Sequence, residues 1–157
     1  MKVDPRLEDI RDDPELAASL RGLISARPST LTGFRAEIAD LRSGHARLRY
    51  PFEAEWCNPR GSLQGGMMAV FLDECIGFAL LGCFPRLERM WATSTLTVSY
   101  LEPVTGPSEA IGRVIRLGRN TAYAEAELHT ADGSVLAARA VSTLTLFDPP
   151  AAHDAHQ

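Results

Sequence analysis

The chain has 157 residues, of which 45% are hydrophobic and 23% are charged, as is usual for one soluble globular domain that buries a core. Its net charge of −4 at pH 7 shows none of the basic excess that is typical of nucleic-acid-binding proteins. The polar start, Met1 to Pro5, lacks the apolar core of a signal peptide, so we expect a cytoplasmic protein.

The first predicted element is a helix in an N-terminal extension over residues 1–30. Asp13-Pro14-Glu15 supplies an Asp cap, a proline at the first helical position and an acid in the first turn. Spaced leucines continue the helical pattern to Ala26. A single domain is expected over residues 31–147, followed by a disordered, proline-containing tail over residues 148–157.

Strand patterns lie on both sides of one long apolar segment. Apolar and polar residues alternate from Phe34, and again over residues 45–52. The segment from Met67 to Phe84 is a predicted helix. Four strands follow at 91–101, 108–117, 122–130 and 135–147, with hairpin signals at 118–120 and 132–133. This order predicts an α+β fold, in which an antiparallel sheet of five to six strands wraps around one long central helix.

Small residues are expected to let the helix and the sheet approach closely. Three alanines, Ala122, Ala124 and Ala126, share one face of a predicted strand. The predicted helix repeats small residues at roughly helical spacing, at positions 66, 69, 73 and 77. A sheet that wraps around a buried helix would use both sets.

Two adjacent acids, Asp73 and Glu74, are the only charges in the apolar segment. They argue against a membrane span, although the segment has almost the length of one. A buried acid is costly unless it is paired or used, so Asp73 is the candidate base or nucleophile. The alternative is a structural acid that a buried hydroxyl or arginine satisfies. Glu74 lies about 100° around the helix and is expected to pair with an arginine.

The glycine pair Gly65-Gly66 stands where the helix is predicted to begin. The first amides of a helix lack internal partners, and the helix dipole favours negative charge there, so these amides suit a carbonyl oxygen that gains charge. A plain transition from loop to helix is the alternative interpretation. Gly65 and Asp73 are eight residues apart, or about 12 Å along one helix. One helix cannot present both groups to one carbon, whereas two antiparallel copies can, which predicts a site between subunits.

Two further polar residues are candidates, each with a structural alternative. Asn58 can hold a water or a carbonyl oxygen with its amide, or it can be an ordinary turn residue before a proline. Thr93 begins a row of hydroxyl residues on one strand face, with Thr95, Thr97 and Ser99, and β-branched residues are also simply suited to sheets. The three cysteines, Cys57, Cys75 and Cys83, lack metal-type spacing, so we expect a reducing compartment and no metal site.

The order Asn58, Gln64-Gly65-Gly66, Asp73, strand 91–101 and Gly118-Arg119-Asn120 resembles the hotdog-fold acyl-CoA thioesterases, and most closely their PaaI-like branch. The resemblance covers about residues 33 to 147. It implies that the Gly65 amide polarises the thioester carbonyl, that Asp73 of the neighbouring subunit is the nucleophile or base, and that Asn58 and Thr93 orient the carbonyl or the water. It also implies a homodimer or a dimer of dimers with its long sheets back to back.

One residue departs from the family pattern. The family usually has His-Gly-Gly at the helix entrance, and this chain has Gln64-Gly65-Gly66. Gln64 and Gly66 are therefore expected to contact the substrate, without a group that titrates. The arginines are candidates for the phosphates of coenzyme A, which enters only as part of the substrate: Arg60, Arg113, Arg116 and Arg119. An apolar acyl pocket or ordinary core packing accounts for Met67, Met68, Phe71 and Phe78.

Three functions fit these residues. The first is hydrolysis of an acyl-CoA thioester, which needs no further cofactor because the thiolate leaves readily. The second is an acyl-CoA-binding protein without turnover, which Gln64 favours. The third is a hydratase, which ranks last because that chemistry generally pairs an Asp with a His, and no histidine lies between His45 and His129.

Overall fold

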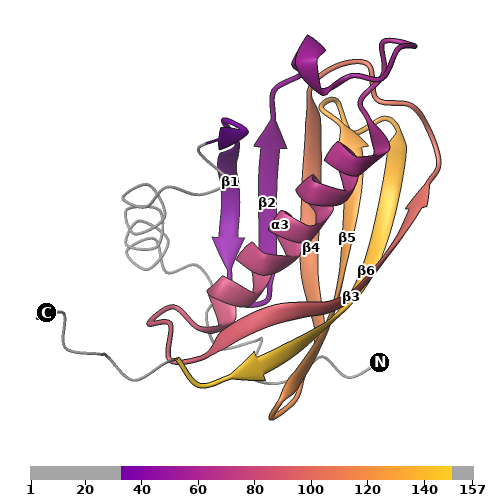
Figure 1. Cartoon of the computed structure of the whole chain (residues 1–157). Coiled ribbons are helices and arrows are strands. Elements are labelled where there is room, and N and C mark those ends of the chain that lie inside the picture. The colour runs from indigo at the N-terminus through magenta and orange to yellow at the C-terminus, as the bar shows by residue number, and fades with distance from the viewer. Residues whose placement is uncertain (1–32, 150–157) are drawn as a thin grey trace, which may run out of the picture.

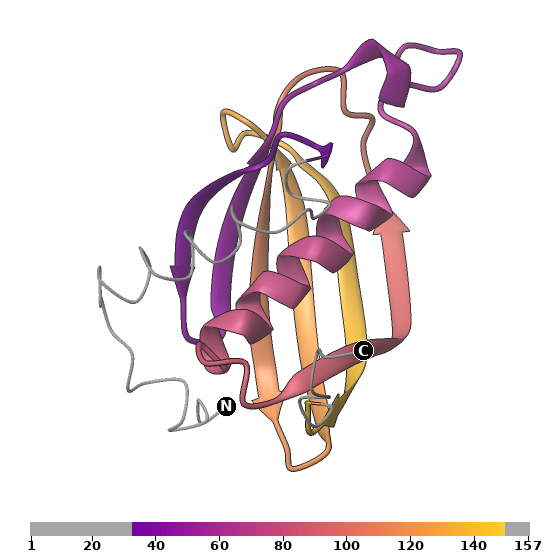
Figure 2. The same ribbon diagram turned by 60° about the vertical axis from the view of Figure 1, so that its left-hand side comes forward.

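The computed structural model describes residues 33–149; the predicted N-terminal helix and most of the predicted tail lie outside this range. One antiparallel sheet curves around one long helix, α3 (Figures 1 and 2). The order of strands across the sheet is β1-β2-β4-β5-β6-β3. The elements are β1 (Glu37–Arg42), β2 (His45–Tyr50), the short helix η2 (Ala54–Trp56), α3 (Gly65–Cys83), β3 (Met90–Tyr100), β4 (Ser108–Leu117), β5 (Thr121–Thr130) and β6 (Leu136–Phe147).

The predicted α+β order is confirmed, with six strands and one long helix in the expected sequence within residues 33–149. The largest shift of a boundary is in the first strand, which begins at Glu37 and not at Phe34. Arg35 has a φ of 50°, a left-handed conformation that a strand cannot contain. The alternation that begins at Phe34 therefore starts before the chain enters the sheet.

Small residues on the sheet allow the close approach of α3. Ala122, Ala124 and Ala126 are all buried, as predicted. Their neighbour Gly112 lies so near the helix that a Cβ atom added there would be 2.6 Å from the carbonyl oxygen of Cys75. No real Cβ atom tolerates that distance, so the glycine sets how closely the helix backbone lies on β4.

The four small residues of α3 that we expected to face the sheet lie on its other side. The buried residues of the helix include most of its large side chains, together with the smaller Cys75, Ala79 and Gly82: Met68, Phe71, Leu72, Ile76, Leu80 and Leu81. Gly66, Ala69, Asp73 and Gly77 are half-buried or exposed. The physical reason is that the concave sheet already supplies alanine and glycine, so bulky helix residues are needed to fill the space. A helix face of small residues is left turned away from the sheet.

The apolar character of α3 is that of a core helix. Its length and hydropathy would suit a membrane span, but half of the relevant residues are buried inside the domain. Phe71 stacks face to face on Tyr50 of β2, with ring centroids 3.8 Å apart. Phe34 and Trp56 pack against the Phe71 ring in T-shaped contacts, which anchors the first turns of the helix.

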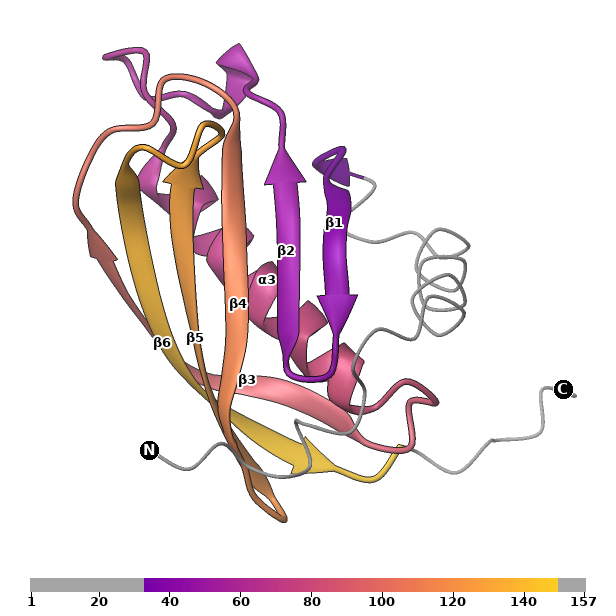
Figure 3. The same ribbon diagram turned by 180° about the vertical axis from the view of Figure 1, so that it is seen from behind.

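Strand β3 forms one edge of the sheet and bends sharply along its length (Figure 2). A bulge interrupts its pairing with β6 between Thr93 and Thr95. Thr93 pairs with the buried Leu144, whereas Thr95 lies with Thr143 in a hollow on the outer face, the side seen in Figure 3. The predicted single row of hydroxyl groups is therefore wrong, because the bulge sends Thr93 to the helix side and Thr95 to the other.

Candidate active site

Asp73 and Thr93 meet in the space between α3 and β3. The Thr93 hydroxyl donates a hydrogen bond of 2.9 Å to Oδ1 of Asp73. Both side chains line a pocket of about 310 Å³, whose other lining residues are Glu74, Gly77, Phe78, Leu81 and Trp91. Asp73 is half-buried and Thr93 is exposed, so a molecule in the pocket can reach the second oxygen of the carboxylate.

Glu74 lines the same pocket as Asp73, but its carboxylate is bound by a residue of the buried core. Oε2 of Glu74 accepts a hydrogen bond of 3.0 Å from the Tyr50 hydroxyl. Burial, and then the negative charge of Glu74, raise the pKa of Tyr50 well above its ordinary value, so the hydroxyl keeps its proton and remains a donor. The adjacent acids thus have different surroundings: Glu74 is tied to the buried ring system, and Asp73 to an exposed hydroxyl.

The entrance of α3 presents the amides that the sequence predicted. Gln64 is extended, with φ −63° and ψ 137°, and its carbonyl oxygen accepts from the N–H groups of Met67 and Met68. Within residues 33–149, the N–H groups of Gly65 and Gly66 have no acceptor. The ring of Tyr100 covers one side of Gly65, where an added Cβ would lie 3.4 Å from it.

The Asn58 side chain organises the loop that leads to this entrance. Its Oδ1 accepts from the N–H of Arg60 at 2.8 Å, and its Nδ2 donates to the Ser62 hydroxyl at 2.8 Å. The main chain closes the same loop, because the N–H of Asn58 donates to the Ser62 carbonyl at 2.8 Å. Asn58 therefore has the turn role that was its structural alternative, and one hydrogen of its Nδ2 is still available to a ligand.

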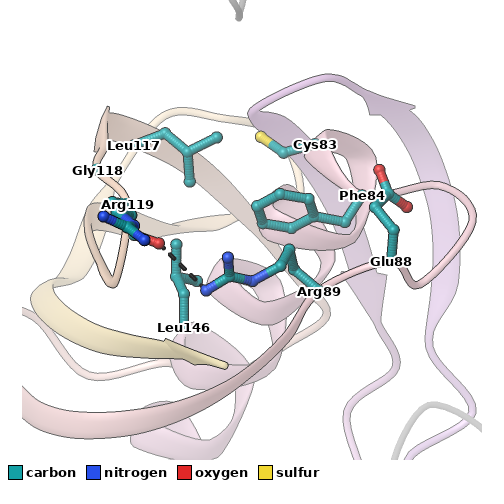
Figure 4. A pocket seen from close by; sticks show the side chains of 8 residues that line it. All are labelled: Cys83, Phe84, Glu88, Arg89, Leu117, Gly118, Arg119 and Leu146. Carbon is teal, nitrogen blue, oxygen red and sulfur yellow. Dashed lines mark hydrogen bonds between the residues drawn. The ribbon is translucent and has the colours of Figure 1, made fainter. Parts of the chain in front are cut away.

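The candidate phosphate ligands do not converge within one chain. Arg60 lies in the loop before α3, and Arg116 is exposed on β4, beside Tyr123. Arg119 lines a separate pocket of about 380 Å³ near the end of α3, with Arg89, Glu88 and Phe84 (Figure 4). There the Arg89 guanidinium donates to the carbonyl oxygen of Arg119 at 3.1 Å. The helix between Arg60 and Arg119 is about 28 Å long.

The acyl-pocket candidates divide between the core and the pocket. Met68 and Phe71 are buried against the sheet, and of the four predicted residues Phe78 alone lines the pocket beside Asp73. Sequence reasoning missed Trp91 and Leu81. The signal for Trp91 was its place two residues before Thr93, on the same face of the strand.

Metal chemistry has no support in the described residues. Residues 33–149 contain no cluster of three or more His, Cys, Asp or Glu side chains that is suited to a metal ion. Cys75 is buried and donates to the carbonyl oxygen of Ala46. Burial raises the pKa of the Cys75 thiol far above its usual value, which makes it an inert core residue.

Comparison with known proteins relates the chain to one family. The model of the Thioesterase superfamily matches residues 60–137, from the helix entrance to the last strand. A relative from Saccharolobus solfataricus, named "Putative esterase", is 30% identical over 108 residues, which are 68% of this chain and 75% of the relative. The chain belongs to the thioesterase superfamily.

Solved structures agree with this membership at the level of the fold. This thioesterase-superfamily chain superimposes on the PaaI protein of the phenylacetic acid degradation operon of E. coli with a TM-score of 0.76 and 16% identity, over 85% of this chain and 94% of that one. A thioesterase of Haemophilus influenzae gives a TM-score of 0.75 and 20% identity, with the same coverage. The resemblance to hotdog-fold thioesterases is thereby confirmed.

Proposed function

We propose that this member of the thioesterase superfamily hydrolyses the thioester bond of an acyl-CoA. The observation that carries the proposal is the Asp73–Thr93 pair beside an open pocket with an apolar end. Asp73 acts as the base or the nucleophile, and Thr93 holds one carboxylate oxygen so that the other faces the substrate. The Gly65 N–H, which has no acceptor among residues 33–149, supplies the oxyanion donor.

The complete site needs a second copy of the chain. Gly65 and Asp73 are about 12 Å apart on one helix, too far to act on the same carbon. Two features favour an antiparallel pairing of copies: the small-residue face of α3 is turned outward, and, within residues 33–149, β3 has β6 as its sole neighbour. Gly65 of one copy then faces Asp73 of the other. Homodimers and dimers of dimers both satisfy this requirement.

In the reaction, Asp73 takes a proton from a water molecule while the water oxygen attacks the thioester carbonyl. The oxyanion that forms is held by the Gly65 N–H of the second copy. When the carbon–sulfur bond breaks, the electron pair leaves with the sulfur of CoA, and the proton held by Asp73 passes to this thiolate, which restores the Asp73 carboxylate. In the direct-attack alternative, a carboxylate oxygen of Asp73 attacks the thioester carbonyl, the CoA thiolate leaves, and water then cleaves the anhydride that remains. Label in Asp73 after a single turnover in H₂¹⁸O would identify the anhydride route, because water that attacks the Asp73 carbonyl of the anhydride leaves its oxygen there.

The separated arginines fit the same pairing. In an antiparallel dimer the end of one α3 lies near the entrance of the other. Arg119 and Arg89 of one copy, together with Arg60 of the second, then form a positive surface for the CoA phosphates, and Arg116 lies outside it.

The test is release of free thiol from a panel of acyl-CoAs, with light scattering on the same preparation. We expect turnover by a protein that is dimeric or larger. A fully active monomer would rule out the shared site.

Binding without turnover is the second candidate, and Gln64 is the residue that favours it. The Gln64 side chain caps nothing at the helix entrance and is exposed, so it can contact a ligand. Calorimetric titration with acyl-CoAs decides: saturable binding without thiol release identifies a binding protein.

A further inference from the structure

We propose that Trp91 is a specificity-determining residue that closes the apolar end of the acyl pocket and so limits the length of the acyl group that the protein accepts. This inference rests on the proposed thioester hydrolysis. It concerns how long the acyl group can be, which the catalytic residues do not decide.

The pocket beside Asp73 has a polar end and an apolar end. Asp73, Glu74 and Thr93 form the polar end, where the thioester would react. Phe78, Leu81 and Trp91 form the apolar end. Leu81 lies eight residues after Asp73 on the same helix, so the pocket extends about 12 Å from the reacting centre. Apolar walls at that depth suit the hydrocarbon part of an acyl group.

A pair of aromatic rings separates this pocket from the next one. The Trp91 ring stacks on Phe84, with centroids 6.5 Å apart and planes 28° from parallel. Trp91 lines the pocket at Asp73, whereas Phe84 lines the pocket of about 380 Å³ that is drawn in Figure 4. Leu146, which pairs with Trp91 across β3 and β6, also lines that second pocket. The two cavities therefore adjoin each other at the Trp91–Phe84 pair.

Because Gly77 has no side chain, the pocket stays open between α3 and the Trp91 indole. A Cβ atom added at Gly77 would lie 3.6 Å from Nε1 of Trp91, which is an ordinary contact distance. A longer side chain at this position would enter the space between α3 and the indole. Trp91 and Gly77 thus set the size of the pocket from opposite walls.

Substitutions at these two positions should shift the preferred acyl length in opposite directions. The assay measures kcat/KM for straight-chain acyl-CoAs from acetyl to palmitoyl, with the wild type, Trp91→Ala and Gly77→Leu. We expect the wild type to lose about tenfold in kcat/KM for each methylene that overruns the pocket. Trp91→Ala should move the optimum to longer chains by removing the indole wall at the apolar end of the pocket, and Gly77→Leu should move it to shorter ones.

The matched control is Tyr123→Ala, which removes an aromatic ring that is 50% exposed on the outer face of the same sheet. It should leave the length profile unchanged. A uniform loss across all chain lengths in Trp91→Ala and in Gly77→Leu would overturn the inference, because it would mean that these residues support the fold or the CoA arm. If Trp91→Ala fails to fold, judged by circular dichroism, or Gly77→Leu fails to dimerise, judged by light scattering, the profile of the other variant decides.

Failure of the proposed function gives a different result. In that case no acyl-CoA releases thiol, with any variant. Calorimetric affinities for the same acyl series then test the pocket directly. An affinity that rises with chain length, falls beyond the limit and shifts in the two variants supports the inference; an affinity independent of length overturns it.

Discussion

The two faces of α3 differ in what they touch and in how tightly they are packed. On the face toward the sheet, Phe71 stacks on Tyr50, and the helix backbone lies against Gly112. On the opposite face, small residues surround Asp73, and the apolar side chains there, such as Phe78, remain only half-buried. The first face is complete within one chain. The second has the character of a surface that another chain covers.

This difference separates stability from chemistry along a single helix. Large side chains on the inner face determine where the helix lies, and they leave the outer face free to hold an acid that would be costly in the core. Tyr50 connects the two, because its ring packs in the core and its hydroxyl bonds Glu74. Substitutions on the inner face should therefore change the free energy of unfolding, and substitutions on the outer face should change the activity. Four substitutions test this, from the largest expected effect to the smallest.

Asp73→Asn should have the largest effect on activity. The amide cannot act as a base or a nucleophile, so kcat should fall by about 10²- to 10⁴-fold. The midpoint of thermal unfolding should hardly change, because the asparagine still accepts a hydrogen bond from Thr93. Glu74→Gln is the control and should retain most of the activity. Equal losses of kcat in the two variants would show that the reaction does not depend on Asp73 more than on Glu74.

Gly65→Pro tests the amide at the helix entrance. Proline is well tolerated at the first position of a helix, and the extended backbone of Gln64 suits the residue before a proline. The substitution deletes one N–H, so kcat should fall by about 10²- to 10³-fold. Gly65→Ala makes the same Cβ contact with Tyr100 but keeps the N–H. If alanine and proline were equally harmful, the Tyr100 contact, and not the lost donor, would be the cause.

Gly112→Ala tests the inner face. Its Cβ would meet the backbone oxygen of Cys75 at 2.6 Å, so helix and strand must separate. We expect a loss of about 1–3 kcal/mol in the free energy of unfolding, measured with urea. The remaining folded protein should keep its kcat. Gly106→Ala is the control, since nothing lies within 4 Å of the added atom.

Thr93→Val should have the smallest effect of the four. Valine has nearly the shape of threonine but cannot donate to Asp73, so the carboxylate loses one restraint. We expect a decrease of about tenfold in kcat/KM, in line with one hydrogen bond to a charged group. The outer-face variant Thr95→Val should be neutral. Activity losses of the same size in Thr93→Val and Thr95→Val would argue against the placement of these residues on opposite faces of β3.

Local patterns in the sequence were sufficient for the elements and for part of the candidate site. Alternation located the strands, and the contrast between an apolar helix and its acids drew attention to Asp73. Such patterns did not show which face of α3 points toward the sheet. That depends on whether the helix or the sheet supplies the small residues where the two meet. The sheet supplies them at Gly112 and Ala126, so the helix supplies the large ones.

Long-range contacts were also beyond prediction from the sequence. Tyr50 reaches Glu74 across 24 positions, and no periodicity links them. The position of Trp91 beside Asp73 depends on how β3 crosses α3 and on the bulge that follows it. The arginines looked like one set in the sequence, yet the fold distributes them over about 28 Å of helix.

The bulge in β3 has a consequence for changes in chain length. Ser94 is the extra residue between Thr93 on the helix side and Thr95 on the outer side, and its hydroxyl lies 2.7 Å from that of Thr145. Deleting Ser94 would restore regular alternation without exchanging the two faces. Deleting a residue farther along, such as Thr97, would bring outer-face residues onto the core for the rest of the strand. Ser94 is therefore the position at which β3 can become one residue shorter while both of its surfaces persist.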